Sequence, residues 1–121
     1  MSDSPLITTE VLNDHTVIAR PVGEIDASNL PEMENILMPL IQNTALIDFV
    51  LDCENLTFID SKVVGYMAYL HTTLARKNRR LLLVAANESV SDIFSLVGLT
   101  EIIPYFDSTD LALNSLKTIS A

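Results

Sequence analysis

An aspartate and a serine are adjacent in the stretch FIDSKVVGYM (58–67), where a polar loop gives way to a helical pattern. A carboxylate and a hydroxyl at this point suit two different roles. Asp and Ser are preferred N-cap residues of helices, and a serine hydroxyl can also be a nucleophile when a base lies within reach. On spacing alone, Asp60 and Ser61 favour a helix cap.

A catalytic role for Ser61 lacks support, because a nucleophilic serine needs a base within hydrogen-bond reach. His71 lies ten residues further along the same predicted helix, which places it about 15 Å away at about 1.5 Å per residue. His15 falls in a predicted turn, from which nothing local delivers it. The sequence has no G-x-S-x-G motif, no glycine-rich phosphate loop and no zinc-ligand spacing. We therefore predict that the chain is not an enzyme and needs no cofactor.

Acidic side chains offer a second kind of site at one edge of the predicted sheet. The candidates are Glu24, Asp26, Asp60 and Asp52. Convergent carboxylates are the ligands that divalent cations prefer. Solvent-exposed loop and cap acids are the favoured interpretation, and an enzyme or small-ligand binder that uses the cluster stays open as an alternative.

Small residues form a stripe along the helix predicted to begin at Ser61. They are spaced four, three and four apart: Ser61, Gly65, Ala68 and Thr72. Residues at this spacing share one helix face, and this face is rotated away from the apolar positions Val63 and Met67, which predict the core side. A face of small side chains lets another backbone approach closely, either that of a partner or that of the same domain.

Hydrophobic periodicity predicts the elements that position these residues. In order they are a β-hairpin (6–22, with a turn at 13–15), a helix (28–43), a strand (45–53), a polar loop (54–58), a helix (61–78), a strand (79–85), a helix (87–99), a short strand (102–106) and a final helix from Asp107. Strands that alternate with helices after an opening hairpin are typical of a mainly parallel sheet. We predict an α/β fold with a mixed, mostly parallel sheet of about five strands, an N-terminal antiparallel pair and about four helices.

Local signals refine three of these boundaries. Pro39 lacks an N–H, so the first helix should end or kink near Met38. Ser89 and Asp92 match a capping box at the start of the third helix. Gly98 stands where a left-handed residue ends that helix.

Composition limits the partners. The chain has 121 residues and a formal net charge of −9, which fits one domain over residues 1–121 and disfavours nucleic acid and anionic membranes. The basic run ARKNRR (75–80) is interpreted as a solvated helix end. Cys53 is predicted to be a buried, reduced thiol. The N-terminal segment has neither a basic nor an apolar targeting region, and no apolar stretch has the length of a membrane span, so we expect a cytoplasmic protein.

Three segments together resemble the anti-sigma-factor antagonist family of bacterial STAS domains. They are VGEID (22–26), LTFIDSKVVG (56–65) and FSLVGLTEIIPYFDSTDLAL (94–113). The resemblance covers roughly Leu6 to Leu116, which agrees with a domain core at about 6–117. Each segment alone is weak, whereas their order and spacing together are fairly specific.

The resemblance implies a partner-switching regulator. In that family the unphosphorylated protein binds a cognate serine kinase, often also an anti-sigma factor, and is released when the kinase phosphorylates the serine of the D-S motif. A PP2C-type phosphatase reverses the modification. Carried onto this chain, the phosphorylated residue is Ser61. The partner-binding residues are Asp60, Lys62, Gly65, Gly23, Glu24 and Asp26.

The sequence departs from the family pattern directly after Ser61. The family commonly reads D-S-[ST]-G-[LV]-G, whereas Lys62 and Val63 follow the serine here and only Gly65 is kept. Lys62 either pairs with a phosphate on Ser61 or marks a divergent member that no longer cycles. In the second case the chain would be a non-cycling STAS adaptor subunit of a stressosome-like or transporter-associated complex, with Ser61 as a cap.

Overall fold

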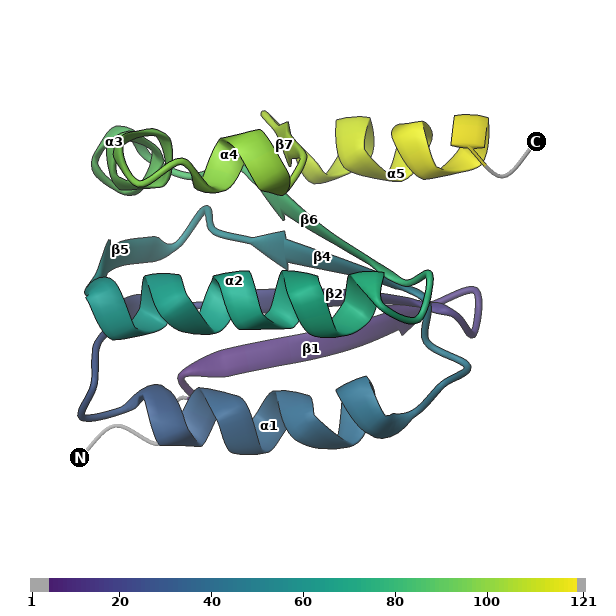
Figure 1. Ribbon diagram of the computed structural model, residues 1–121, viewed down its shortest axis with the longest axis horizontal. Coiled ribbons are helices and arrows are strands. Elements are labelled where there is room, and N and C mark those ends of the chain that lie inside the picture. The colour runs from purple at the N-terminus through teal and green to yellow at the C-terminus, as the bar shows by residue number, and fades with distance from the viewer. Residues whose placement is uncertain (1–4, 120–121) are drawn as a thin grey trace.

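The computed structural model describes residues 5–119 of the chain. The elements, in chain order, are β1 (Ile7–Leu12), β2 (Thr16–Pro21), β3 (Gly23–Ile25), α1 (Leu30–Gln42), β4 (Asp48–Asp52), β5 (Leu56–Ile59), α2 (Ser61–Ala75), β6 (Arg80–Val84), α3 (Glu88–Leu96), α4 (Leu99–Ile102), β7 (Tyr105–Phe106) and α5 (Thr109–Ile119). Figure 1 shows their arrangement.

The main sheet has the strand order β1-β2-β4-β6-β7. β1 and β2 are antiparallel, and β2, β4, β6 and β7 pair in parallel. The prediction of a mixed, mostly parallel sheet with an N-terminal antiparallel pair is therefore confirmed. The four longer helices, α1, α2, α3 and α5, also match the prediction, whereas α4 is a single turn of four residues.

Two short strands that the sequence did not predict form a separate parallel pair. The segment expected to be a polar loop contains β5, which pairs with β3. The side chains of Leu56 and Ile59 are buried, while Thr57 and Phe58 between them are exposed. Leu56, Phe58 and Ile59 are apolar, but the two buried ones are three positions apart, so the segment lacked the alternation of inward and outward residues that predicts a strand. This pair places the residues after Ile25 close to the start of α2.

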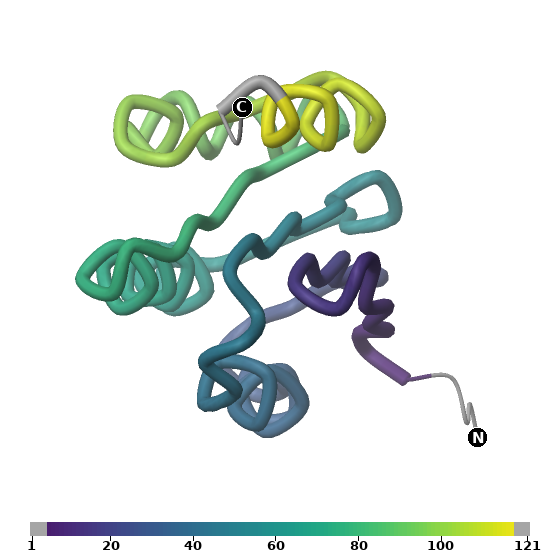
Figure 2. The backbone as a smooth tube through the Cα atoms, turned by 90° about the vertical axis from the view of Figure 1, so that its right-hand side faces the viewer, coloured from purple at the N-terminus to yellow at the C-terminus, as the bar shows by residue number. Residues whose placement is uncertain are grey.

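The sheet is covered on both faces, as a parallel sheet requires. Side chains from α1, α2, α3 and α4 join one face in the larger core cluster. The second cluster contains Ile18, Val50 and Leu82 of the sheet, and Ala112 and Leu116 of α5. Figure 2 shows α1 at the bottom, α2 at the left and the C-terminal helices along the top. Of these C-terminal helices, only α5 joins the second cluster.

The first helix continues through its proline, so of the two outcomes expected near Met38, an end or a kink, the end is wrong. α1 contains Pro39 and runs to Gln42. In a regular helix the N–H of residue 39 would donate to the carbonyl of Asn35. Pro39 and Asn35 are both exposed, so water can bond the freed carbonyl and the interruption costs little.

The third helix begins two residues earlier than its predicted capping box. Asn87 is the N-cap of α3, and its side chain accepts a hydrogen bond from the N–H of Val90 at 2.9 Å. Ser89 and Asp92 therefore lie inside the helix. Gly98 has a φ of 80°, which confirms the left-handed residue after this helix. The chain then forms α4, so the expected strand at 102–106 is reduced to the two residues of β7.

Arg79 corrects the interpretation of ARKNRR as a solvated helix end. Its side chain is buried, and its guanidinium donates to the carbonyls of Ile41 at 2.7 Å and Leu46 at 2.8 Å. It also lies over the ring of Phe49, 5.4 Å from the centroid. The cation thus complements the negative C-terminal end of α1, a helix distant in sequence, while Arg76 remains exposed.

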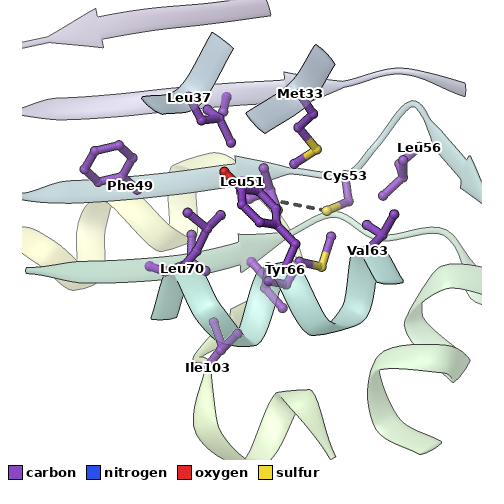
Figure 3. Close-up of a cluster of buried hydrophobic side chains, with 14 of the residues drawn as sticks. Met33, Leu37, Phe49, Leu51, Cys53, Leu56, Val63, Tyr66, Leu70 and Ile103 are labelled. Atoms are coloured by element: carbon purple, nitrogen blue, oxygen red, sulfur yellow. Dashed lines mark hydrogen bonds between the residues drawn. The ribbon is translucent and has the colours of Figure 1, made fainter. Parts of the chain in front are cut away.

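Cys53 lies in the larger core cluster, as predicted. It is a free, fully buried thiol that donates to the carbonyl of Leu51 at 3.6 Å. Figure 3 shows it between side chains from α1 and α2, with Met33 and Val63 nearby. Burial, with a smaller contribution from Asp52, raises the pKa of this thiol. The reactive thiolate is therefore disfavoured.

Candidate functional site

Asp60 is the residue that caps α2. One carboxylate oxygen accepts a hydrogen bond from the N–H of Val63 at 3.1 Å. The other accepts from the N–H of Ala27 at 2.9 Å. A single side chain therefore satisfies the start of α2 and connects it to the loop that follows β3, a segment 33 residues away in sequence.

Ser61 is the first residue of α2, and its side chain is exposed. Within residues 5–119 its hydroxyl has no hydrogen-bond partner. The same part of the chain provides no partner for the N–H groups of Ser61 and Lys62. Because Asp60 performs the capping, the hydroxyl of Ser61 is free, and the idea that Ser61 serves as a cap is wrong.

A short loop after β3 is held rigidly beside this helix start. The N–H of Asp26 donates to the side-chain oxygen of Asn29 at 2.8 Å, and the amide of Asn29 donates to the carbonyl of Glu24 at 2.9 Å. Gly23 has a φ of 77° and donates its N–H to the carbonyl of Asn55 at 2.8 Å. That φ favours glycine, so Gly23 sets the backbone course at the start of β3, the strand that leads into this loop.

The carboxylate of Asp26 is occupied within the same loop. One of its oxygens accepts from the hydroxyl of Ser28 at 2.5 Å and from the N–H of Ser28 at 2.9 Å. The Ser28 hydroxyl, followed by that N–H, lowers the pKa of Asp26 below its ordinary value. Asp26 is therefore a negative charge at neutral pH, located in the loop that Asp60 binds.

The four candidate acids do not form one cation site. Asp52 lies on β4 with an oxygen 3.6 Å from the guanidinium of Arg20, whereas Asp60 bonds to the loop after β3. Glu24 is exposed. In the described part of the chain, no group of three or more His, Cys, Asp or Glu residues is placed to hold a metal ion. The structure thus brings Asp26 and Asp60 to one loop and separates Asp52 from them.

The outer face of α2 carries the predicted small residues. Ser61, Gly65 and Thr72 are exposed, and Ala68 is half-buried. A methyl group added at Gly65 would meet no atom within 4 Å among the described residues, apart from its own helix backbone and chain neighbours. Val63, which occupies the position of the first family glycine, is fully buried in the core. The replacement of that glycine by Val63 therefore lies in the core. At the surface beside Ser61, only the exposed Lys62 departs from the family pattern.

Sequence reasoning missed a groove that continues this surface between α1 and α2. The groove has a volume of about 500 Å³, and its lining includes Lys62, Met38, Tyr66 and Tyr69. The two tyrosine rings stack with centroids 6.1 Å apart. Burial, with the nearby Glu34 carboxylate, raises the pKa of Tyr66, so its hydroxyl stays protonated at neutral pH. Exposed apolar residues on two helices that face each other are the signal for this groove. The sequence does not show which helices face each other, so the signal could not be used.

Comparison with known proteins identifies the fold family. The sequence profile of the STAS domain matches residues 7–112. The chain belongs to the STAS domain family. This confirms the family resemblance stated from the sequence.

Anti-sigma factor antagonists are among its curated and structural neighbours. The anti-sigma-B factor antagonist of Staphylococcus aureus is 24% identical over 89 residues, which cover 74% of this chain and 82% of that protein. A putative anti-sigma factor antagonist from Thermotoga maritima has a structure with a TM-score of 0.84 at 21% identity, covering 92% of this chain and 94% of that one.

A third neighbour is known in a modified state. The Bacillus cell fate determinant SpoIIAA in its phosphorylated form gives a TM-score of 0.72 at 21% identity, covering 91% of this STAS chain and 98% of that one. At these identities the structural matches show the shared fold. Among residues 5–119, no helix is long and apolar enough to cross a membrane.

Proposed function

We propose that this STAS domain is an anti-sigma-factor antagonist that works by partner switching. Its unphosphorylated form binds a serine kinase that is also an anti-sigma factor. Phosphorylation of Ser61 releases the complex, and a PP2C-type phosphatase restores the binding form. The distant relationship to the Staphylococcus aureus antagonist supports the class of function, and the geometry around Ser61 supports the mechanism.

One observation carries the proposal: Ser61 stands at the start of a helix, and yet its hydroxyl is exposed and has no partner within residues 5–119. The adjacent Asp60 has taken the capping role, with hydrogen bonds to Val63 and Ala27. A structural serine would use its hydroxyl in the cap. Here the hydroxyl is instead exposed at the first residue of α2, where a kinase can reach it.

A phosphoryl group at Ser61 is tolerated by the free domain. It would bring about −1.5 to −2 charges and three acceptor oxygens. The N–H groups of Ser61 and Lys62 have no other partner within residues 5–119, and the positive end of the helix dipole favours an anion at this position. The side chain of Lys62 is exposed and offers a cation next to the modified serine.

The same group opposes a docked partner. Asp60 is adjacent in sequence, and the loop that it binds carries the ionised Asp26. A contact that excludes water from this region would bury the new charges beside two carboxylates, and burial of unpaired charge is costly. Release therefore follows from local desolvation and repulsion and needs no refolding.

The test is ATP-dependent labelling of the purified chain in a lysate of its source cells. We expect phosphate on Ser61 in the unmodified chain and none in the Ser61→Ala variant. Ser115→Ala is the matched control, because Ser115 is another helical serine whose hydroxyl is already bonded to the carbonyl of Ala112 at 2.7 Å. Equal labelling of the unmodified chain and Ser61→Ala would exclude Ser61 as the acceptor.

A further inference from the structure

The groove between α1 and α2 contains polar groups that the fold does not use. Figure 1 shows the two helices side by side. Each helix lines the groove with residues three or four positions apart, among them Glu34 and Met38 of α1 and Lys62, Tyr66 and Tyr69 of α2. Residues at this spacing share one helix face. The groove has a volume of about 500 Å³, which lies in the range of ligand-binding pockets.

Tyr66 directs an unbonded hydroxyl into this groove. The residue is only 9% exposed, yet its hydroxyl has no hydrogen-bond partner within residues 5–119. No enclosed side-chain oxygen or nitrogen in that part of the chain lacks a partner, so this hydroxyl reaches the accessible surface, which Tyr66 does in the groove that it lines. Figure 3 shows its ring extending from α2 in the direction of α1, with the hydroxyl oxygen at the outer end. An occupant of the groove can therefore bond to this hydroxyl as donor or acceptor.

Glu34 gives the groove an uncompensated negative charge. The residue is half-buried, and no hydrogen bond or ion pair joins its carboxylate to another residue in the described part of the chain. The carboxylate lies near Tyr66, because it is the second cause, after burial, that raises the pKa of that hydroxyl. Lys62 also lines the groove, but it makes no ion pair with Glu34 or with any other described acid. A partly buried charge is screened less than an exposed one, so Glu34 attracts a cation into the groove.

Tyr69 adds an exposed aromatic ring to the same groove. It stacks on the ring of Tyr66 and is itself 60% exposed, so much of its ring is open to an occupant. Cations bind over aromatic faces, arginine more often than lysine. A guanidinium also matches a carboxylate with two parallel hydrogen bonds. Met38, which is 49% exposed on the α1 side, offers apolar contact for the methylene stem of such a side chain.

We propose that the groove between α1 and α2 binds an arginine side chain of a partner protein. The guanidinium pairs with Glu34, lies against the ring of Tyr69 and donates to the hydroxyl oxygen of Tyr66. The net charge of −9 favours the approach of a basic segment, and the exposed Lys62 keeps its ammonium group in water. The proposal concerns the unmodified chain, so it does not depend on phosphorylation of Ser61.

Amide NMR spectra of the full, unmodified chain test this proposal. The probe is the synthetic peptide acetyl-Leu-Arg-Leu-amide. Two control peptides change only the central side chain: citrulline has the shape of arginine without its charge, and lysine has the charge without the planar group. We expect the arginine peptide to shift the signals of Glu34, Tyr66 and Tyr69 saturably, with a dissociation constant of roughly 1 mM. The citrulline peptide should bind about ten-fold more weakly, because it offers no charged donor to the carboxylate, and the lysine peptide about three-fold more weakly, because it stacks less well.

Two matched variants locate the effect. Glu34→Gln removes the acid of the groove, and Glu32→Gln removes an exposed acid of the same helix that does not line it. Both variants change the net charge equally and differ only in position. We expect Glu34→Gln to weaken binding of the arginine peptide by about ten-fold and Glu32→Gln to retain it. Tyr69→Leu, at an exposed position, should weaken binding by about three-fold.

The proposal is overturned if the citrulline or lysine peptide binds as well as the arginine peptide, if Glu34→Gln retains the affinity, or if no saturable shift appears at about 10 mM peptide. Stronger binding of acetyl-Leu-Asp-Leu-amide would assign the groove to an acidic partner through Lys62, and would overturn it too. Shifts of the same signals that grow with protein concentration alone would assign the groove to a second copy of the chain, which also contradicts the proposal.

Discussion

At the scale of single residues, Asp60 and Ser61 have different roles at the start of α2, and this difference decides whether Ser61 can be modified. Either residue type could have capped α2. The carboxylate has two acceptor oxygens and uses them on two different segments, at Val63 and Ala27. The hydroxyl is thereby left without a structural task, which is the condition for modifying it without damage to the fold.

Asp60→Ala should lower the free energy of unfolding by about 1–2 kcal/mol, because the N-cap bond is lost together with the bond to Ala27. Ser61→Ala should change it by less than about 0.5 kcal/mol, because an exposed, unbonded hydroxyl contributes little. Urea denaturation followed by circular dichroism measures both. A loss of stability in Ser61→Ala that matched Asp60→Ala would show that the serine has the structural role.

The carboxylate of Asp26 gives a prediction for pH. Its pKa is lowered chiefly by the Ser28 hydroxyl, so Ser28→Ala should move the pKa of Asp26 up toward its ordinary value. A folded-state pKa below the unfolded value stabilises the protein above the unfolded pKa, and this contribution is lost as the pH falls through the folded pKa. Carbon-detected NMR titration of the carboxyl groups measures the shift, and an unchanged pKa in Ser28→Ala would contradict the assigned cause.

At the scale of elements, α2 presents two opposite faces with different duties. Val63, Met67 and Leu70 are buried and fix the helix to the sheet, as Figure 3 shows for Val63 and Leu70. Gly65 lies on the exposed face, where a side chain would meet nothing. A glycine inside a helix weakens it, so its presence without a packing reason suits a face that another backbone approaches.

Gly65→Ala should raise the free energy of unfolding by about 0.5–1 kcal/mol, because alanine is the better helix former and no neighbour obstructs its methyl group. Gly65→Trp should also fold, yet it should weaken binding of the kinase partner by about ten-fold or more through steric obstruction. Calorimetric titration with the partner tests this. Unchanged affinity of Gly65→Trp would remove this face of α2 from the interface.

Arg79 connects two elements that no sequence pattern joined. Arg79→Met should destabilise the fold by roughly 2 kcal/mol or more, because the carbonyls at the end of α1 lose a charged donor. The matched control is Arg76→Met, at an exposed position three residues earlier, which should change stability by less than about 0.5 kcal/mol. Equal effects in thermal unfolding would refute the clamp assigned to Arg79.

Features that depend on residues close together in the sequence were predicted, whereas contacts between residues far apart in the sequence were not. The core face of α2, the hairpin and the left-handed Gly98 depend on periodicity or on single-residue backbone preference, and these were predicted correctly. The bond from Asp60 to Ala27 and the burial of Arg79 join residues 33 or more positions apart. Such contacts depend on how the elements pack, and no local pattern encodes them. For the same reason the sequence left open whether the acids at 24, 26, 52 and 60 meet in one cluster, and the fold separates Asp52 from the others.

At the scale of the whole molecule, the net charge is large, whereas the proposed switch acts only on groups near Ser61. The net charge is −9, so a phosphoryl group adds about −1.5 to −2 to a chain that is already strongly acidic. Beyond about 10 Å, salt at 0.1 M screens such a change. The effect on a partner must therefore come from groups in contact with Ser61.

The phosphorylated domain should keep the fold of the unmodified one. The helix dipole stabilises an anion at the N-terminus by about 0.3–1 kcal/mol at an exposed site, so the free energy of unfolding should change by less than about 1 kcal/mol. Thermal unfolding of the two forms and comparison of their amide NMR spectra measure this. Spectral changes that spread into the core strands β4 and β6 would indicate a conformational mechanism in place of the local one.

The central claim, that Ser61 is a reversible switch, is tested most directly by the intact mass of the protein purified from its native cells. The account predicts one phosphoryl adduct that a PP2C-type phosphatase removes and that is absent from Ser61→Ala. A chain that carries no such adduct under any growth condition, or keeps it in Ser61→Ala, would contradict the account. The first of these results would favour a non-cycling STAS adaptor, in which Lys62 marks the loss of the switch.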